Sequence, residues 1–168
     1  MSVTTLAGNI HLEHCITVSR PPEQVYRFWR NFENLPRFMK NIASVRILGP
    51  TRSHWIVKGP MGRSLEWDAE IIHDQENVLV AWRAVEGADV MNAGSVRFLP
   101  LHWGRRTEVK VALNYEPPGG KMGDLLTRLI GERPEDQIRE DLHRFQQVLE
   151  TGEVATIEGQ PRGRCARA

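Results

Sequence analysis

The sequence predicts an α+β fold in which one curved antiparallel sheet of seven strands is crossed by C-terminal helices. Two observations lead to this prediction. Short segments with alternating apolar residues follow one another from residue 44 to residue 115, and glycine, proline or polar turns separate them. Helical apolar stripes occur only after the first strand and after residue 120. A curved sheet with an amphipathic helix across its concave face can enclose a cavity.

The N-terminal segment predicts a strand followed by two short helices. Apolar residues alternate from Ile10 to Val18, which is the period of a half-buried strand. The prolines at 21 and 22 suit the first turn of a helix, whose apolar stripe runs to Phe32. We expect residues 34–36 to interrupt this helix and a second short turn to carry Phe38 and Met39.

Six further strands are expected to form one antiparallel meander, because the connections between them have hairpin length. Their expected positions are Val45–Leu48, His54–Lys58, Leu65–Ile72, Val78–Ala84, Met91–Leu99 and Thr107–Tyr115.

The C-terminal segment predicts two helices. One apolar stripe contains Met122, Leu125, Leu126, Leu129 and Ile130, and a second contains Ile138, Leu142, Phe145 and Leu149. At 3.6 residues per turn the centres of the two stripes lie roughly 160° apart, so one straight helix cannot bury both. Gly131 and Pro134 supply the break. We expect residues 1–150 to form a single domain and residues 151–168 to form a flexible polar tail.

Composition excludes several classes of function. The 168 residues include 22 Lys+Arg and 21 Asp+Glu, a net charge of +1 that argues against a dedicated nucleic-acid binder. Cys15 and Cys165 make no disulfide framework and favour a reducing compartment. No stretch approaches the ~20 apolar residues of a membrane span. The expectation is a cytoplasmic protein, monomeric or homodimeric, without stable membrane insertion.

No cofactor or metal site is expected. The sequence has no phosphate-binding loop, dinucleotide fingerprint or zinc-helix motif. His11 and His14 are three residues apart, which places them on opposite faces of a strand and argues against a metal pair. Glu66, Asp68 and Glu70 alternate on one strand face, where we expect them to pair with Lys58, Arg83 or Arg97 on a solvated surface.

Strand alternation identifies the residues that face the concave side of the sheet. These faces are apolar with a few polar residues, as in small-ligand sites. The candidate ligand-binding residues are Trp29, Phe38, Trp55, Trp67, Asn92, Gly94, Phe98 and Tyr115. The alternative is that the aromatic residues only fill the core. Gly94, inside a strand, indicates either close approach of a helix or a bulge.

His14 and Tyr115 are the candidate catalytic residues. His14 is the one titratable group on the apolar face of the first strand, where it could exchange a proton near neutral pH. A core histidine bonded to a neighbour is the alternative. Arg105 and Arg106 mark a hairpin tip, and Trp103 lies in the same loop. We expect the basic segments to be solvated, with weak contact to anionic lipid or RNA as an alternative.

The order of elements resembles the helix-grip fold of the START-like (SRPBCC) superfamily, which includes polyketide cyclase/dehydrase, coenzyme Q-binding and pollen-allergen-like lipid-binding proteins. Residues 8 to 150 carry the resemblance, and the local match is to a bacterial cyclase/dehydrase-type branch. The matching segments are Pro22–Trp29, Phe32–Met39, His54-Trp55, Lys58–Pro60, Glu66–Ile71 and Gly94–Phe98. The resemblance implies an internal pocket for a hydrophobic small molecule.

Three functions remain open at this point. The leading one is binding of a hydrophobic or aromatic small molecule between the sheet and the C-terminal helix. The second is an aromatase/cyclase that guides cyclisation and dehydration of a poly-carbonyl substrate, with Asn92 orienting an oxygen beside His14 or Tyr115. The third is an accessory protein that binds a protein partner through its outer sheet or tail.

Overall fold

The computed structural model describes residues 2–6, 9–59, 62–116 and 134–152, which form one antiparallel sheet and three helices. The sheet has the strand order β1-β2-β8-β7-β6-β5-β4-β3. The strands are β1 (Ser2–Leu6), β2 (Asn9–Val18), β3 (Ile42–Ile47), β4 (Arg52–Lys58), β5 (Ser64–Gln75), β6 (Leu79–Ala84), β7 (Met91–Leu101) and β8 (Arg106–Glu116). The helices are α1 (Pro22–Arg30), the 3-10 helix η1 (Phe32–Arg37) and α3 (Pro134–Thr151).

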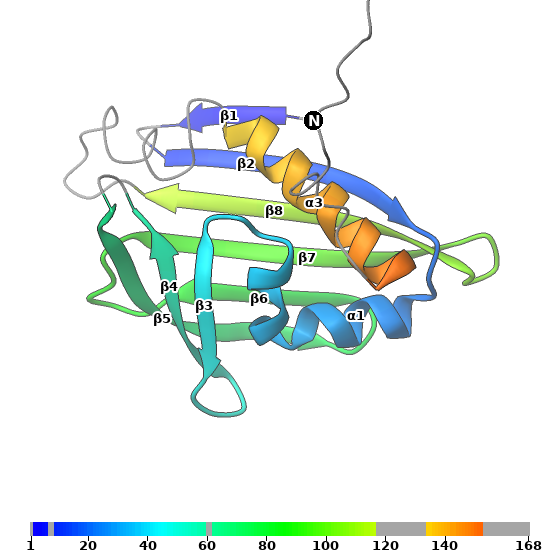
Figure 1. Cartoon of the computed structure of the whole chain (residues 1–168), viewed down its shortest axis with the longest axis horizontal. Coiled ribbons are helices and arrows are strands. Elements are labelled where there is room, and N and C mark those ends of the chain that lie inside the picture. The colour runs from blue at the N-terminus through cyan, green and yellow to red at the C-terminus, as the bar shows by residue number, and fades with distance from the viewer. Residues whose placement is uncertain (1, 7–8, 60–61, 117–133, 153–168) are drawn as a thin grey trace, which may run out of the picture.

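The sheet is strongly curled. In Figure 1, β3 and β4 run across the direction of β2 and β8, and α3 lies over β2 and β8. The seven expected strands are present within a few residues of their predicted ends. An eighth strand, β1, was not predicted; it pairs with β2 from Ser2↔Glu13 to Leu6↔Asn9. Its five residues are too few for an alternating pattern to stand out.

The break between the two N-terminal helices lies earlier than predicted. α1 ends at Arg30, and Asn31 takes an extended conformation with φ −81° and ψ 91°. The Asn31 side chain accepts a hydrogen bond from the Glu33 amide at 3.2 Å, which starts η1. Asparagine competes in this way for backbone amides and stops helices. Residues 34–36 therefore lie inside η1 instead of interrupting a helix.

Helix α3 begins at Pro134, where the sequence predicts a helix start. It buries Ile138, Leu142 and Phe145, three residues of the second predicted stripe. Arg20 holds its C-terminal end: Nε donates to the Leu149 carbonyl at 3.0 Å and Nη2 to the Glu150 carbonyl at 2.8 Å. These bonds satisfy carbonyls that a helix end leaves without partners. The expected helix around residues 122–130 and the tail from residue 153 lie outside the described residues.

No helix within the described ranges has both the length and the apolar composition needed to cross a bilayer.

Gly94 makes room for an indole ring. It lies opposite Trp82 in the register of β6 and β7, which is continuous at this point. A Cβ atom at Gly94 would lie 2.3 Å from Cζ2 of Trp82 and 2.7 Å from Cε2. Both alternatives from the sequence were therefore wrong, because the close neighbour is a side chain of the adjacent strand and no bulge is present.

We predict that Gly94→Ala destabilises the fold by about 1–3 kcal/mol, because the new methyl group must displace Trp82. Urea unfolding measures this loss. Gly49→Ala is the matched control, since no atom lies within 4 Å of a Cβ placed there. In a Trp82→Leu background the Gly94→Ala penalty should shrink; an equal penalty in both backgrounds would contradict the explanation.

Candidate ligand cavity

One cavity of about 100 Å³ lies between the concave face of the sheet, the connection from η1 to β3, and the N-terminal half of α3. For comparison, a buried apolar cavity of ~150 Å³ accepts benzene. The described residues that line it are Leu12, Trp29, Leu35, Met39, Asn41, Ile42, Trp55, Val57, Trp67, Trp82, Val90, Asn92, Ala93, Leu113, Tyr115, Gln137, Ile138 and Asp141.

Three tryptophans from neighbouring strands form a stacked row on the cavity wall. Trp55 of β4 pairs with Trp67 of β5 in the strand register. The centroid of the Trp55 ring lies 6.1 Å from that of Trp67, with an angle of 18° between the ring planes. It lies 6.1 Å from the centroid of Trp82, with an angle of 22°. Phe32 of η1 packs edge-on against Trp55 at 5.5 Å and against Trp82 at 5.4 Å. These rigid contacts keep the rings from collapsing into the space beside them.

A fourth tryptophan, Trp29 of α1, lines the cavity next to α3. Its ring packs edge-on against Phe145 at 4.8 Å and lies 5.2 Å from Phe38. The Nε1 atoms of Trp29 and Trp67 are both buried, and no described residue accepts a hydrogen bond from either. Buried donors without partners are uncommon in folded proteins. Two such donors in cavity-lining side chains favour a ligand that carries acceptor atoms.

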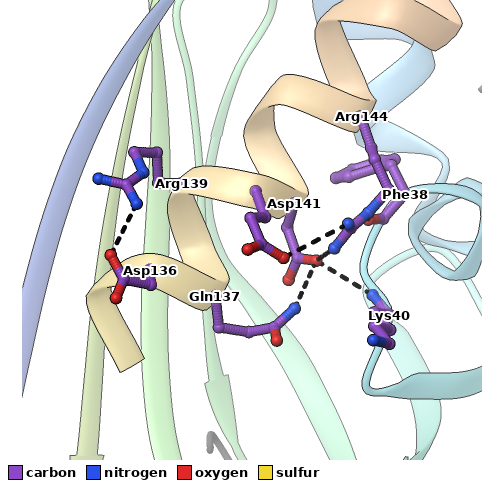
Figure 2. Close-up of polar contacts among 8 residues, drawn as sticks. Phe38, Lys40, Asp136, Gln137, Arg139, Asp141 and Arg144 are labelled. Carbon is purple, nitrogen blue, oxygen red and sulfur yellow. Dashed lines mark hydrogen bonds and ion pairs between the residues drawn. The ribbon is translucent and has the colours of Figure 1, made fainter. Parts of the chain in front are cut away.

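The polar part of the cavity wall centres on Asp141 of α3. This carboxylate is buried, and its Oδ1 accepts from the Lys40 amide at 3.2 Å, from Gln137 Nε2 at 2.8 Å and from Arg144 Nη2 (Figure 2). Burial raises the pKa of Asp141 despite these hydrogen bonds. All three of these hydrogen bonds end on Oδ1, and the carboxylate has a second acceptor oxygen, Oδ2.

Tyr115 lies on the cavity wall at the end of β8, opposite Asn92 of β7 in the register. Burial, with a smaller contribution from the negative charge of Asp141, raises the pKa of Tyr115 to about 12. The hydroxyl is therefore protonated at neutral pH and can donate a hydrogen bond to a ligand carbonyl.

The structure brings five of the eight candidate ligand-binding residues to the cavity: Trp29, Trp55, Trp67, Asn92 and Tyr115. The other three do not line it. Phe38 packs against Trp29 and Phe145, and Phe98 packs edge-on against Tyr26 at 5.8 Å. Gly94 accommodates Trp82, which lines the cavity in its place.

Sequence reasoning missed most of the other lining residues, and Trp82, Gln137 and Asp141 are the most informative of these. Trp82 alternates with Val80 and Ala84, so the strand period could have placed it on the inward face. Asp141 directly precedes Leu142 at the border of the helical stripe, where a carboxylate usually faces solvent. Nothing in the sequence marks it as buried.

His14 does not line the cavity. It is half-buried on β2, and its Nδ1 is buried without a partner among the described residues. Burial lowers the pKa of His14, and the nearby His143 and Arg139 of α3 lower it further. The expected bond to a neighbour is absent at Nδ1, and of the two catalytic candidates only Tyr115 lies at the cavity.

The acidic residues of β5 form pairs on the outer face of the sheet. Glu70 lies 3.7 Å from Arg83, one of the expected partners. Glu66 and Asp68 instead flank His54. Glu66 Oε2 lies 3.4 Å from His54 Nε2, and Asp68 Oδ1 lies 2.8 Å from His54 Nδ1. Across the described part of the chain, no group of three such side chains is arranged to hold a metal ion.

A family model described as polyketide cyclase / dehydrase and lipid transport matches residues 18–143. The structure of a Deinococcus radiodurans protein is 35% identical over 84% of this chain and 98% of that chain, with a TM-score of 0.69. No curated protein matches the chain.

Two more distant structures share the fold, which confirms the expected helix-grip arrangement. A START superfamily protein from Mycobacterium smegmatis is 18% identical, covers 83% of this chain and 98% of that chain, and has a TM-score of 0.66. The Zhui aromatase/cyclase from Streptomyces sp. R1128 is 19% identical, with a TM-score of 0.54. The match covers 86% of this chain and 90% of that chain.

The buried carboxylate predicts a measurable pH dependence of stability. Because the folded pKa of Asp141 is raised, its contribution to stability is complete below the unfolded pKa of 3.8 and is lost as the pH rises through the folded pKa. Asp141→Asn keeps an acceptor for Lys40 but does not ionise. We expect the free energy of unfolding of Asp141→Asn, relative to that of the parent, to increase as the pH rises from about 4 to about 7.

Urea unfolding at several pH values measures this difference. Glu140→Gln is the matched control, because Glu140 is an exposed carboxylate on the same helix. A similar change in Glu140→Gln, or none in Asp141→Asn, would contradict the assignment to Asp141.

Proposed function

Since the chain belongs to the polyketide cyclase/dehydrase and lipid transport family, we propose that it binds a small aromatic or hydrophobic molecule in the cavity between the sheet and α3. The row of Trp55, Trp67 and Trp82 is the observation that carries the proposal. Their flat faces offer stacking surface to a planar ligand. The free, exposed thiol of Cys15 supports a cytoplasmic location for this function.

The polar groups of the cavity restrict the ligand further. Trp29 Nε1, Trp67 Nε1 and the Tyr115 hydroxyl are donors, so the ligand is expected to carry carbonyl or phenolic oxygens. Asp141 Oδ2 is an acceptor and suits a ligand hydroxyl. The cavity is partly open, and its volume of about 100 Å³ is smaller than the ~150 Å³ that holds benzene, so it favours a small planar molecule held partly inside it over a long acyl chain.

Filling the cavity should abolish binding. Leu113 is half-buried on β8 and lines the cavity opposite Gly94. We predict that Leu113→Trp weakens the affinity for 1-naphthol by about tenfold or more, because the added ring occupies the space that 1-naphthol would fill. Isothermal titration calorimetry with the purified full chain measures the affinity.

Leu99→Trp is the matched control for this experiment. Leu99 also lies on a long strand of the sheet, but it is exposed and does not line the cavity. Unchanged 1-naphthol affinity is expected for it. Equal weakening in both variants, or no binding of 1-naphthol and larger naphthoquinones by the parent, would contradict a ligand site in this cavity.

Cyclisation of a poly-carbonyl substrate is the second candidate function, and the Tyr115–Asp141 arrangement is the observation that favours it. In an aldol cyclisation a base removes a proton beside one carbonyl, the new carbanion bonds to a second carbonyl carbon, and an acid gives a proton to the resulting alkoxide. Asp141 Oδ2 suits the base and the Tyr115 hydroxyl suits the acid, with Asn92 placed to orient an oxygen.

If this second function holds, Tyr115→Phe lowers turnover of a linear triketide thioester by about a hundredfold or more, because the protonated phenol supplies the acid. Binding of 1-naphthol should change far less, which separates catalysis from affinity. His14→Ala is the comparison variant, since His14 does not line the cavity. Full turnover in Tyr115→Phe would rule the cyclase assignment out while leaving ligand binding intact.

A further inference from the structure

The tip of the β7–β8 hairpin, residues 99–106, presents a fully exposed tryptophan. The other four tryptophans are buried, whereas Trp103 has no contact that shields it from solvent. His102 and Trp103 have φ values of 49° and 60°, and Gly104 follows at 78°. Bulky residues rarely adopt this left-handed region, and such strain is typical of functional loops. Backbone bonds from Gly104 to Leu101 and from Arg105 to His102 hold the turn.

The hairpin tip is also cationic and partly apolar. It carries the exposed His102 and Arg105 and the half-buried Arg106, whose Nε is buried, and the nearest acidic residue along β8 is Glu108, opposite Leu99 in the register. Leu99 is 38% exposed at its base. In Figure 1 the hairpin projects past the ends of β2, α1 and α3, so none of these elements covers it.

We infer that this hairpin tip docks on the surface of an anionic lipid bilayer. Tryptophan prefers the boundary between headgroups and acyl chains, because its ring is apolar while its N–H remains polar. Arginines beside it are attracted to the negative surface of the leaflet. Lipid is favoured over nucleic acid, since two arginines neutralise too few phosphates for firm binding while Trp103 and Leu99 add an apolar contribution.

Docking at this tip leaves the cavity free. The cavity residues Asn92 and Tyr115 lie at the opposite end of the same two strands, about 30 Å along the strands from Leu101 and Arg106 at ~3.3 Å per residue. The bilayer would therefore hold the protein by one end, with the ligand site directed away from the lipid. This contact is peripheral and does not depend on the proposed ligand function.

Co-flotation with vesicles of phosphatidylcholine and about 30 mol% phosphatidylserine tests the inference at low ionic strength. We expect the full chain to bind these vesicles and not pure phosphatidylcholine, and to dissociate as salt is added. Trp103→Ala should lower the partition coefficient on the order of tenfold, and Arg105→Gln about fivefold. Acrylamide quenching of Trp103 should also fall when vesicles are present.

Two matched variants test whether the loss of any exposed apolar side chain or any exposed arginine lowers vesicle binding. Ile72→Ala removes another exposed apolar side chain, and Arg97→Gln removes another exposed arginine; both should bind vesicles like the parent. Affinity for 1-naphthol should be unchanged in Trp103→Ala, which shows that the cavity is intact. Vesicle binding that is absent, or equal in Trp103→Ala and the parent, overturns the inference, as does Trp103-dependent binding of an RNA oligonucleotide without vesicle binding.

Discussion

The cavity depends on one buried carboxylate. Asp141 attaches the N-terminal half of α3 to the backbone at Lys40, while Arg144 of the same helix donates to the Phe38 carbonyl at 3.0 Å. The next turns pack through Phe145 against Trp29. The helix is therefore held both by these polar bonds and by its buried apolar residues Ile138, Leu142 and Phe145. Because those bonds join α3 to the connection between η1 and β3, they hold together two segments that both line the cavity.

Rigid aromatic packing maintains the opposite wall. The Trp82 ring can occupy its position only because Gly94 has no side chain, and the Trp55 ring stacks against both Trp82 and Trp67. Phe32 supports the row from η1. Rings that pack against one another in this way cannot rotate freely into a neighbouring void, so the wall is preorganised before any ligand arrives. Preorganisation of this kind lowers the entropic cost of binding.

The long strands β7 and β8 separate two chemical environments. One end carries Asn92 and Tyr115 beside the cavity, and the other end carries Trp103 with Arg105 in the solvent. The same hairpin thus connects a buried ligand site and a proposed lipid contact without placing either in the way of the other. A short hairpin would bring the two regions together and make ligand access depend on the membrane.

The sequence by itself determined the α+β class, seven of the strands, the start of α3 and the inward positions of Trp55, Trp67 and Tyr115, because strand and helix periods are local properties of the chain. Tertiary structure decided the rest. The space at Gly94 depends on the register of β6 against β7, and alternation within each strand does not determine which residue of one lies opposite a given residue of the other. Asp141 looks like a solvated helix residue until Lys40 and Arg144 surround it, and His14 leaves the site only because α3 crosses β2 at that point.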